Sequence, residues 1–428
     1  MRTTKTAGLV GGCIGLLLFS LLSMDWIVLL VIIPLVILLF FGVLLFQGKE
    51  PQLDITRHLS HVKIFEDDHV DVTVTIKNKG SHVPFIEIID VLPNRVNLEQ
   101  GSNYAVLSLK PQEEITFTYT VSCPVRGHYD IGPLNVRIRD YLSFFFKELP
   151  FNTVSELTVI PQIEEIGDVA VRAKANIYPG IMHTKHAGIG TEFFGLREYT
   201  TSDTFKRINW KSFARWNRIM VNEYELESTT DIILMVDARE SQDIGTLKHN
   251  PIEYNIKAAV SIASHFLKRR DRVGLIIYGN TEGKLKWVYP ESGKKQLYKT
   301  IAELVEAQAE GTFLLNAVID TAITHMLPKK ALIILFSSLD DDPTIPAAIQ
   351  QLVAQKFNVI VLSPSPIDIE FSLQPHDLSY ELAHKILTFE RKNVLALLRN
   401  KGARVVDWNP TLPLAVSLKE VERYQIRR

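Results

Sequence analysis

Two long apolar runs open the chain, and a change of hydrophobic period follows them. They cover residues 7–24 and 26–46, with only Asp25 between them. Each has roughly the 20 apolar residues that a helix needs to cross a bilayer core. The pattern predicts a membrane hairpin of two helices within residues 1–48. A cleaved signal peptide for the first run and one long helix are the rival interpretations.

The flanking charges predict the orientation of this hairpin. Arg2 and Lys5 precede the first run, Lys49 follows the second, and Asp25 lies at the turn. The positive-inside rule then places both ends in the cytoplasm. We therefore expect a two-pass protein of the cell membrane with its soluble domains facing the cytoplasm and the lipid bilayer as one partner.

Residues 49–162 follow a period of two. Within residues 69–78, Val70, Val72, Val74 and Ile76 alternate with polar or charged residues, and turn motifs separate this run from similar ones. Alternation is typical of strands buried on one face, because successive side chains point to opposite sides. Many short strands of this kind predict an antiparallel, immunoglobulin-like β-sandwich. It carries no obvious chemistry, so a spacer or binding role is expected.

Residues 229–428 have a third pattern. Near-continuous apolar runs at 231–237, 272–279, 331–338 and 358–364 alternate with helical segments. Such runs fit strands buried on both faces, and the alternation predicts a doubly wound α/β domain with a parallel sheet. Ligands of these folds bind beyond the carboxyl ends of the strands. The positions to inspect are thus 237–241, 279–281, 337–342 and 363–365.

Composition and motifs narrow the function classes. The 428 residues carry a formal net charge of -1, so no overall positive field favours nucleic acid, which is an unlikely partner. The two cysteines, Cys13 and Cys123, do not suggest a disulfide framework. No phosphate-binding glycine loop and no G-x-S-x-G elbow occurs, and His183 and His186 lack further metal ligands nearby. No catalytic residue is assigned.

The linker and signature segment, residues 163–228, is unusually rich in rings and positive charges between 192 and 218. Ser202 as N-cap and Asp203 in the first turn predict a helix over 203–217. Phe205, Ile208 and Trp216 then share one face. Trp210 lies outside that face, where it would contact a second domain. A basic stripe lies on another face and consists of Arg207, Lys211, Arg215 and Arg218.

Three interpretations of this stripe stay open. It pairs with acids of the same chain, such as Glu223, Glu225, Glu227 or the 340–342 run. Alternatively, together with Arg197, it docks an acidic protein partner or the anionic inner leaflet. The third is RNA or DNA binding, for which interleaved aromatic and basic residues are typical, but no basic surplus extends over the chain.

The segment "FFGLREYTTSDTFKRINWKSFAR", followed by "VNEYELE" and a buried strand ending in Asp, resembles the signature of the domain-of-unknown-function-58 (DUF58) family. "VRGHYDIGPLNVRIRD" in the β region resembles another stretch of that family. The resemblance implies structural roles for Glu198, Tyr199, Asp203 and Trp210. It also implies a partnership with MoxR-type AAA ATPases, beside which members are often encoded, and a C-terminal domain similar to von Willebrand factor type A folds.

The von Willebrand resemblance implies a magnesium site that this chain matches only in part. Metal-binding members carry Asp-x-Ser-x-Ser, a Thr and a later Asp, whose oxygens suit magnesium. Here Asp237 and Ser241 match, Arg239 replaces the middle serine, and Thr312 is at the threonine position. Ser338 stands where the later acid is expected, with Asp340 close by. Arg239 could replace the metal by a charge-assisted hydrogen bond to Asp237. In a plainer interpretation, Asp237 and Ser241 buttress the turn.

Together these patterns predict a membrane-anchored, cytoplasm-facing interaction or scaffold protein, not an enzyme. It would work with a MoxR-type AAA ATPase in the assembly or maturation of membrane or envelope complexes. No cofactor is expected, and magnesium belongs only to the alternative interpretation. The alternative is a metal-dependent hydrolase or adhesion protein that uses Asp237, Ser241 and Thr312 as a degenerate metal-ion-dependent adhesion site.

Overall fold

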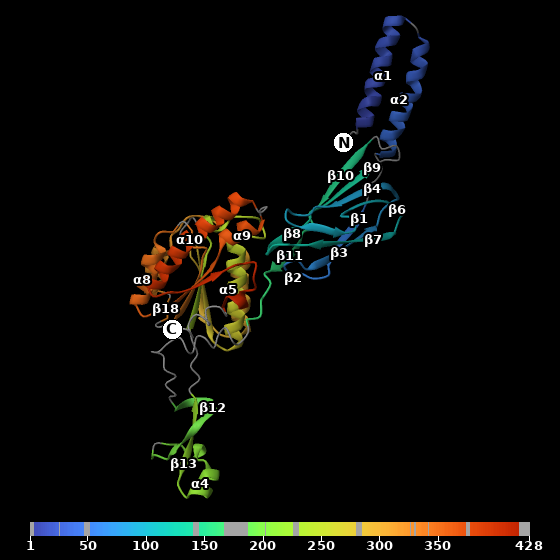
Figure 1. Ribbon diagram of the computed structural model, residues 1–428. Coiled ribbons are helices and arrows are strands. Elements are labelled where there is room, and N and C mark those ends of the chain that lie inside the picture. The colour runs from blue at the N-terminus through green and yellow to red at the C-terminus, as the bar shows by residue number, and fades with distance from the viewer. Residues whose placement is uncertain are drawn as a thin grey trace. The chain divides into compact units, whose positions relative to one another are not determined.

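The computed structural model (Figure 1) describes residues 4–24, 26–46, 52–139, 145–166, 187–201, 203–225, 231–279, 285–325, 327–328, 331–340, 342–373 and 377–418. The chain divides into two compact units, Met1–Pro161 and Gln162–Arg428. The predicted multidomain organisation, with N-terminal helices, β-sheets and then an α/β region, is confirmed at this level. His183, His186, Ser202 and Glu227 lie outside the described residues.

Two apolar helices begin the first unit, α1 (Thr4–Ser23) and α2 (Ile27–Phe46). Among the described residues, one helical segment, Lys5–Ser23, is long and apolar enough to cross a membrane, and Ile27–Gly42 is a shorter apolar stretch. A helix that is apolar all round fits a lipid environment better than a water-facing surface. One candidate anchor near the N-terminus is thus present. The second crossing and the orientation stay predictions.

Three small sheets complete the first unit. The first sheet has the order β1 (Leu53–Leu59), β3 (His69–Asn78), β7 (Glu114–Ser122), β5 (Asn97–Gln100). The second has the order β10 (Phe146–Phe151), β9 (Leu134–Arg139), β4 (Val83–Asp90), β6 (Tyr104–Leu109). The third joins β2 (Lys63–Phe65), β11 (Ser155–Ile160) and β8 (Gly127–Ile131). In β3 the four alternating apolar residues are fully buried, as the period predicts.

A buried ion pair ties these sheets together. Arg57 of β1 donates from Nε to Asp90 Oδ2 over 2.9 Å, and both side chains are inaccessible to solvent. Arg57 Nη1 also donates to the carbonyls of Ile131 and Thr153, each over 2.7 Å. The Tyr119 hydroxyl donates to the same Asp90 carboxylate over 2.7 Å. Each buried charge therefore has several partners, which is the condition under which buried ion pairs are tolerated.

The second unit contains a six-stranded sheet in the order β16 (Lys286–Glu291), β15 (Arg272–Tyr278), β14 (Asp231–Asp237), β17 (Leu332–Phe336), β18 (Asn358–Pro364), β19 (Arg404–Trp408). All neighbours are parallel except β15 and β16. After β14 the chain adds β15 and β16 on one side of that strand, and after β17 it adds β18 and β19 on the opposite side of the sheet. The carboxyl ends of β14 and β17 therefore form the position where folds of this kind bind ligands.

Helices cover both faces of this sheet. α5 (Pro251–Lys268) lies on one side, and α8 (Ile345–Ala354) and α10 (Leu378–Asn400) lie on the other (Figure 1). Helices α6 (Lys294–Glu306), α7 (Leu315–His325) and α9 (Pro366–Leu373) also belong to this α/β region. One buried cluster joins the sheet to α7, α8 and α10. α5 begins with two favourable residues, since Asn250 accepts a hydrogen bond from the Glu253 amide and proline follows it.

The signature segment forms a hairpin of β12 (Ala187–Glu198) and β13 (Met220–Glu225) instead of the predicted long helix. Between these strands lie a short turn, η1 (Phe205–Arg207), and one brief helix, α4 (Trp210–Trp216). Asn209 caps α4 by accepting from the Ser212 amide, and Asn217 ends it in the left-handed conformation. The prediction of a helix over 203–217 is wrong because these two asparagines are better cap residues than interior ones.

Candidate functional site

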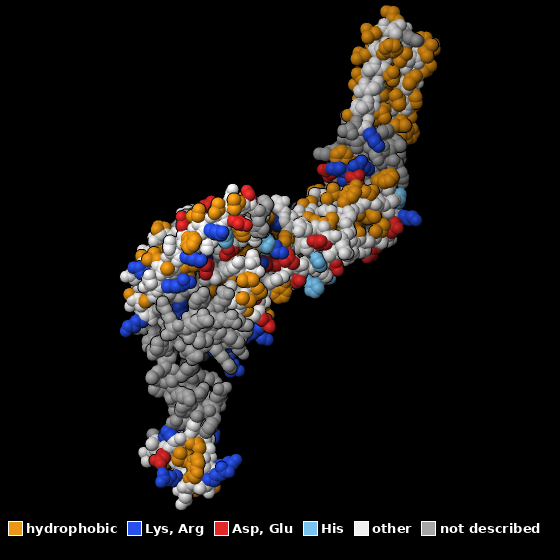
Figure 2. Space-filling model, viewed as in Figure 1, with side chains coloured by type: hydrophobic (Ala, Val, Ile, Leu, Met, Phe, Trp, Pro, Cys, Tyr) orange, Lys and Arg blue, Asp and Glu red, His pale blue; other side chains and the backbone are white. Residues whose placement is uncertain are grey.

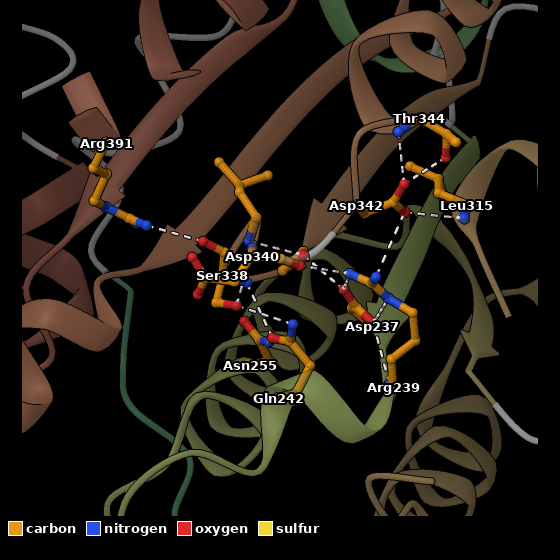
Figure 3. A network of polar contacts seen from close by, with 12 residues as sticks. Asp237, Arg239, Gln242, Asn255, Leu315, Ser338, Asp340, Asp342, Thr344 and Arg391 are labelled. Atoms are coloured by element: carbon orange, nitrogen blue, oxygen red, sulfur yellow. Dashed lines mark hydrogen bonds and ion pairs between the residues drawn. The ribbon is translucent and has the colours of Figure 1, made fainter. Parts of the chain in front are cut away.

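An arginine fills the position at the carboxyl end of β14. Asp237 ends that strand, and Arg239 folds back onto it with Nε 2.9 Å from Oδ1 and Nη2 2.7 Å from Oδ2 (Figure 3). The Ser337 hydroxyl at the end of β17 donates to the same carboxylate over 2.7 Å. The side chains of Asp237 and Arg239 are 0% and 3% exposed. The two-pronged geometry is the strongest form of arginine–carboxylate contact.

A second carboxylate lies on the far side of this guanidinium. Asp342 Oδ2 is 3.8 Å from Arg239 Nη1. Asp342 also accepts hydrogen bonds from the amides of Leu315 and Thr344, over 3.2 and 2.8 Å. The acid near the site is therefore Asp342, while Asp340 contributes its backbone carbonyl, 3.3 Å from Arg239 Nη2. The predicted position of the later acid, Ser338, holds no carboxylate.

A second internal arginine joins the neighbouring strand ends. Arg391 of α10 donates to the Ser338 carbonyl over 2.9 Å and to the Ser363 hydroxyl over 2.8 Å. Its Nε donates to Asp407 over 3.0 Å. Gln242 donates to the Ser338 hydroxyl and accepts from the Ser338 amide (Figure 3). The ends of β14, β17, β18 and β19 are thus cross-linked by side chains of this chain.

Arg239 and Tyr278 each keep a single protonation state at ordinary pH. Burial lowers the pKa of Arg239, but the hydrogen bonds and negative charge of Asp237 outweigh it, and the pKa is raised overall. Burial, with a smaller contribution from Asp237, raises the pKa of Tyr278 well above its usual range. Arg239 is therefore a permanent cation and Tyr278 a neutral phenol. Neither is suited to exchange protons as a catalytic acid or base.

The residues do not fit a resident magnesium ion. Arg239 occupies both oxygens of Asp237, and a fixed positive charge repels a second cation. Ser241 lies in the turn η2 (Glu240–Gln242), where its hydroxyl is buried without a hydrogen-bond partner among the described residues. Thr312 is exposed to solvent. No group of three His, Cys, Asp or Glu side chains within the described ranges could hold a metal.

We expect the thermal midpoint of the full chain to be the same in chelator and in millimolar magnesium or manganese. A ligand that binds the folded state at ~100 times its Kd would add about 2.7 kcal/mol of stability. Differential scanning calorimetry in detergent makes this comparison. A reproducible rise with either metal would contradict the assignment of Arg239 as the resident cation.

The second candidate site is the α4 surface, defined as the exposed hydrophobic and basic residues at the tip of the hairpin. Phe205, Trp210 and Trp216 are 73%, 63% and 59% exposed, whereas Ile208 is buried. The prediction that Phe205, Ile208 and Trp216 share one face of a helix is therefore wrong. Figure 2 shows hydrophobic side chains at this tip with Lys and Arg beside them. The other members are Phe213, Ile219, Lys206, Lys211, Arg215 and Arg218.

Two ion pairs account for part of the local charge. Both Nη atoms of Arg197 donate to Asp203, which also accepts from the Thr200 amide. The Arg197 hydrogen bonds, followed by that of Thr200, hold the pKa of Asp203 well below its usual range. Arg197 is thus committed to the hairpin, which argues against its predicted docking role. Arg218 Nη1 lies 3.5 Å from Glu198 Oε1. Both side chains are largely exposed, so this ion pair is weak.

The remaining basic residues face solvent. Lys211 and Arg215 are exposed and Arg207 is half-buried, and none forms an ion pair with an acid whose side chain the structure describes. The side chains of Glu223 and Glu225 lie outside that description. Asp342 is engaged by Arg239 and backbone amides. Of the signature residues, Tyr199 packs on Phe205 with ring centroids 6.2 Å apart, and Trp210 is exposed.

A family model matches this region. Described as "Protein of unknown function DUF58", it covers residues 195–368, from within β12 to within α9. The uncharacterized protein YeaD of Bacillus subtilis (strain 168) is 25% identical over 254 residues, 57% of this chain. The chain spans 59% of that relative's length. These similarities support the DUF58 resemblance of the signature and the α/β region.

Solved structures give weaker similarities. The CARDB domain of the PF1109 protein from Pyrococcus furiosus aligns with 27% of this chain and 99% of its own, at 18% identity and a TM-score of 0.20. Proximal thread matrix protein 1 from the mussel byssus aligns with 45% of this chain and 46% of its own, at 12% identity and a TM-score of 0.31. At such TM-scores neither bears on fold or function.

Sequence reasoning missed three residues of the buried network, Gln242, Asn255 and Arg391. Asn255 donates to Gln242 Oε1 over 3.2 Å from within α5. One signal was available for Arg391, which lies four and seven residues before Leu395 and Leu398 on the buried face of α10. A charged residue on an apolar helical face predicts a buried partner. No comparable signal marks Gln242, because its partner Ser338 is distant in sequence.

Proposed function

We propose that this chain is a membrane-anchored, cytoplasm-facing interaction protein that docks an acidic partner protein through the α4 surface. The observation that carries the proposal is the exposure of Trp210 and Trp216 beside basic side chains. Tryptophan and arginine are the residues that most often dominate binding energies. Exposed rings of this size on one short segment also mark an interaction site rather than ordinary surface. The segment lies within the family match.

In this proposal the first unit is an immunoglobulin-like β-sandwich spacer, and the second is a von Willebrand factor type A-like domain. The strand order and the aspartate at the end of β14 support the second assignment. A metal-dependent hydrolase or adhesion protein is disfavoured, because Arg239 occupies Asp237. Metal-binding von Willebrand factor type A domains bind a partner's carboxylate through a metal ion at the carboxyl end of the sheet. The proposed docking mechanism does not include such a metal bridge.

The anchor is proposed to be a two-pass hairpin of α1 and α2 with both ends in the cytoplasm. The apolar length of Lys5–Ser23 and the entirely apolar sequence of α2 support it. The flanking charges support the orientation. The proposed partner is a MoxR-type AAA ATPase, and the proposed role is the assembly or maturation of membrane or envelope complexes. The family resemblance is the support for this partner.

The test compares affinity purification of the full chain from membranes of its native host with that of two double variants. Trp210→Ala with Trp216→Ala should reduce recovery of the AAA ATPase at least ~30-fold, because two interface rings at about 1–2 kcal/mol each are removed. Tyr289→Ala with Tyr298→Ala is the matched control, since these rings are exposed elsewhere, by 63% and 69%. This control should recover the partner normally.

Higher salt should weaken the same complex, because the basic residues of the surface are exposed to ions. Equal recovery from the wild type and the tryptophan variant would reject the α4 surface as the docking site. Binding of the purified chain to phosphatidylglycerol vesicles, lost in the tryptophan variant while no ATPase is recovered, would assign the surface to the membrane instead of to a protein.

A further inference from the structure

The outward face of α10 exposes a row of large hydrophobic side chains. Leu382, Ile386 and Phe389 are 53%, 60% and 68% exposed. The opposite face packs on the domain through Arg391, Leu395 and Leu398. Figure 2 shows hydrophobic and basic side chains interspersed over this part of the α/β unit. Single exposed apolar residues are ordinary, but a continuous row along one helix indicates a surface that is covered by something else.

The row follows a seven-residue repeat. With Leu382 at position d, the seam positions a and d hold Leu382, Ile386, Phe389, Asn393 and Ala396. Position g holds three exposed basic residues at intervals of seven, Lys385, Lys392 and Arg399. The buried residues Arg391 and Leu398 fall at position f, opposite the seam. This is the arrangement of a coiled-coil strand whose outer side is docked on its own domain and whose seam faces outward.

The charges beside the seam favour a second copy of the same helix. In a parallel pair, a g residue meets the e residue of the next heptad on the other helix. Lys385 then meets Glu390 of the second copy, and the two-fold axis makes this pair twice. Lys392 meets Leu397 in the same way, and its long alkyl stem can cover that side chain. The helix is thus complementary to itself.

The same charges exclude the antiparallel alternative. An antiparallel pair places g beside g, so that Lys385, Lys392 and Arg399 of both copies would face one another. Like charges at such spacing are destabilising. Asn393 at an a position also suits a parallel pair, where one polar residue in the seam fixes register and the number of strands.

We propose that two copies of this chain associate through α10 as a parallel helix pair around a two-fold axis. Such an interface is isologous, since the same patch serves both copies. Most helical stability in proteins comes from tertiary packing. α10 is 23 residues long, and its buried residues Arg391, Leu395 and Leu398 already pack it against its own domain.

The first test measures the mass of the full chain in detergent by light scattering over a range of concentrations. We expect a dimer for the wild type and, for Ile386→Asp, a Kd at least ~100-fold weaker, because a buried charge replaces an isoleucine in both copies. Leu387→Asp is the matched control. Leu387 is 44% exposed on the same helix but lies at position b, outside the seam, so this variant should remain a dimer.

A charge-reversal series distinguishes loss of the dimer from failure of a variant to fold. Lys385→Glu and Glu390→Lys should each weaken the dimer about threefold or more, because two weak exposed pairs become repulsive. The double reversal should restore the wild-type Kd. Circular dichroism of each variant should match the wild type, since all these side chains are exposed.

Cross-linking gives an independent readout. In a Cys13→Ser background, Ala396→Cys at position d should form a disulfide between copies, whereas Ala302→Cys on α6, also exposed, should not. Burial raises the pKa of Cys123 to about 11, so that thiol will not compete. A wild-type monomer at every concentration would overturn the proposal. So would a dimer insensitive to Ile386→Asp and to charge reversal, or a monomer that uses this face to bind vesicles or another protein.

Discussion

Replacing Arg239 with alanine is expected to lower the free energy of unfolding of the α/β unit by roughly 3–5 kcal/mol. Asp237 is fully buried and receives two hydrogen bonds from the Arg239 side chain. Without them the Asp237 carboxyl group keeps, among the residues that the structure describes, only the Ser337 hydroxyl and a backbone amide as hydrogen-bond partners. An uncompensated buried charge is among the most costly single defects in a folded protein. The expected loss is therefore a large share of the whole stability of an ordinary domain.

Hydrogen exchange is the suitable measurement, because a chain of two units need not unfold in one transition. The urea dependence of exchange in peptides from β14 and β17 reports the α/β unit alone. Arg215→Ala, an exposed arginine, is the control and should change stability by less than ~0.5 kcal/mol. The double variant Asp237→Asn with Arg239→Met should recover most of the loss, because neither charge is then buried. A loss below ~1 kcal/mol in Arg239→Ala would show that Asp237 finds other compensation.

The second large effect is expected in the first unit, where Arg57→Met should cost about 3–5 kcal/mol. Both members of the Arg57–Asp90 pair are inaccessible to solvent, and Arg57 also satisfies two backbone carbonyls. The matched control is Arg137→Met, which breaks the exposed pair with Glu148 and should cost at most ~1 kcal/mol. Tyr119→Phe removes one hydrogen bond to Asp90 and should cost ~1–3 kcal/mol.

Exchange in peptides from β3 and β7 reports these losses, and exchange in β14 should not change. Equal effects of Arg57→Met and Arg137→Met would contradict the view that burial sets the magnitude. An effect that reached β14 would instead mean that the two units unfold together.

Hydrophobic period was a good guide wherever a strand is buried on one or both faces. The alternation of Val70 to Ile76 and the continuous apolar run of residues 231–237 correspond to β3 and β14, because burial of a strand dictates which positions are apolar. The helix predicted over residues 203–217 was wrong for the opposite reason. Its exposed rings and charges carry no burial period, and the caps Asn209 and Asn217 decide its structure locally.

The buried network was only partly accessible from the sequence. The sequence shows that Arg239 replaces the middle serine of the Asp-x-Ser-x-Ser pattern. A contact between Arg239 and Asp237 could also be predicted, because the two residues are only two positions apart. Arg391 reaches Ser338 across 53 positions, so only the fold brings the two together. The seven-residue repeat of α10 is also written in the sequence. Which of its faces covers the sheet, and hence which is left outward, depends on the packing of Leu395 and Leu398.

The contact of Arg239 with Asp237 has a consequence for how the domain responds to its surroundings. A magnesium ion must be recruited from solution, and its occupancy follows the supply of the ion. A guanidinium attached two residues along the backbone has an effective concentration fixed by the chain itself. It cannot be chelated, diluted or exchanged for calcium. The edge of the sheet should therefore keep one shape through every change in divalent ion levels.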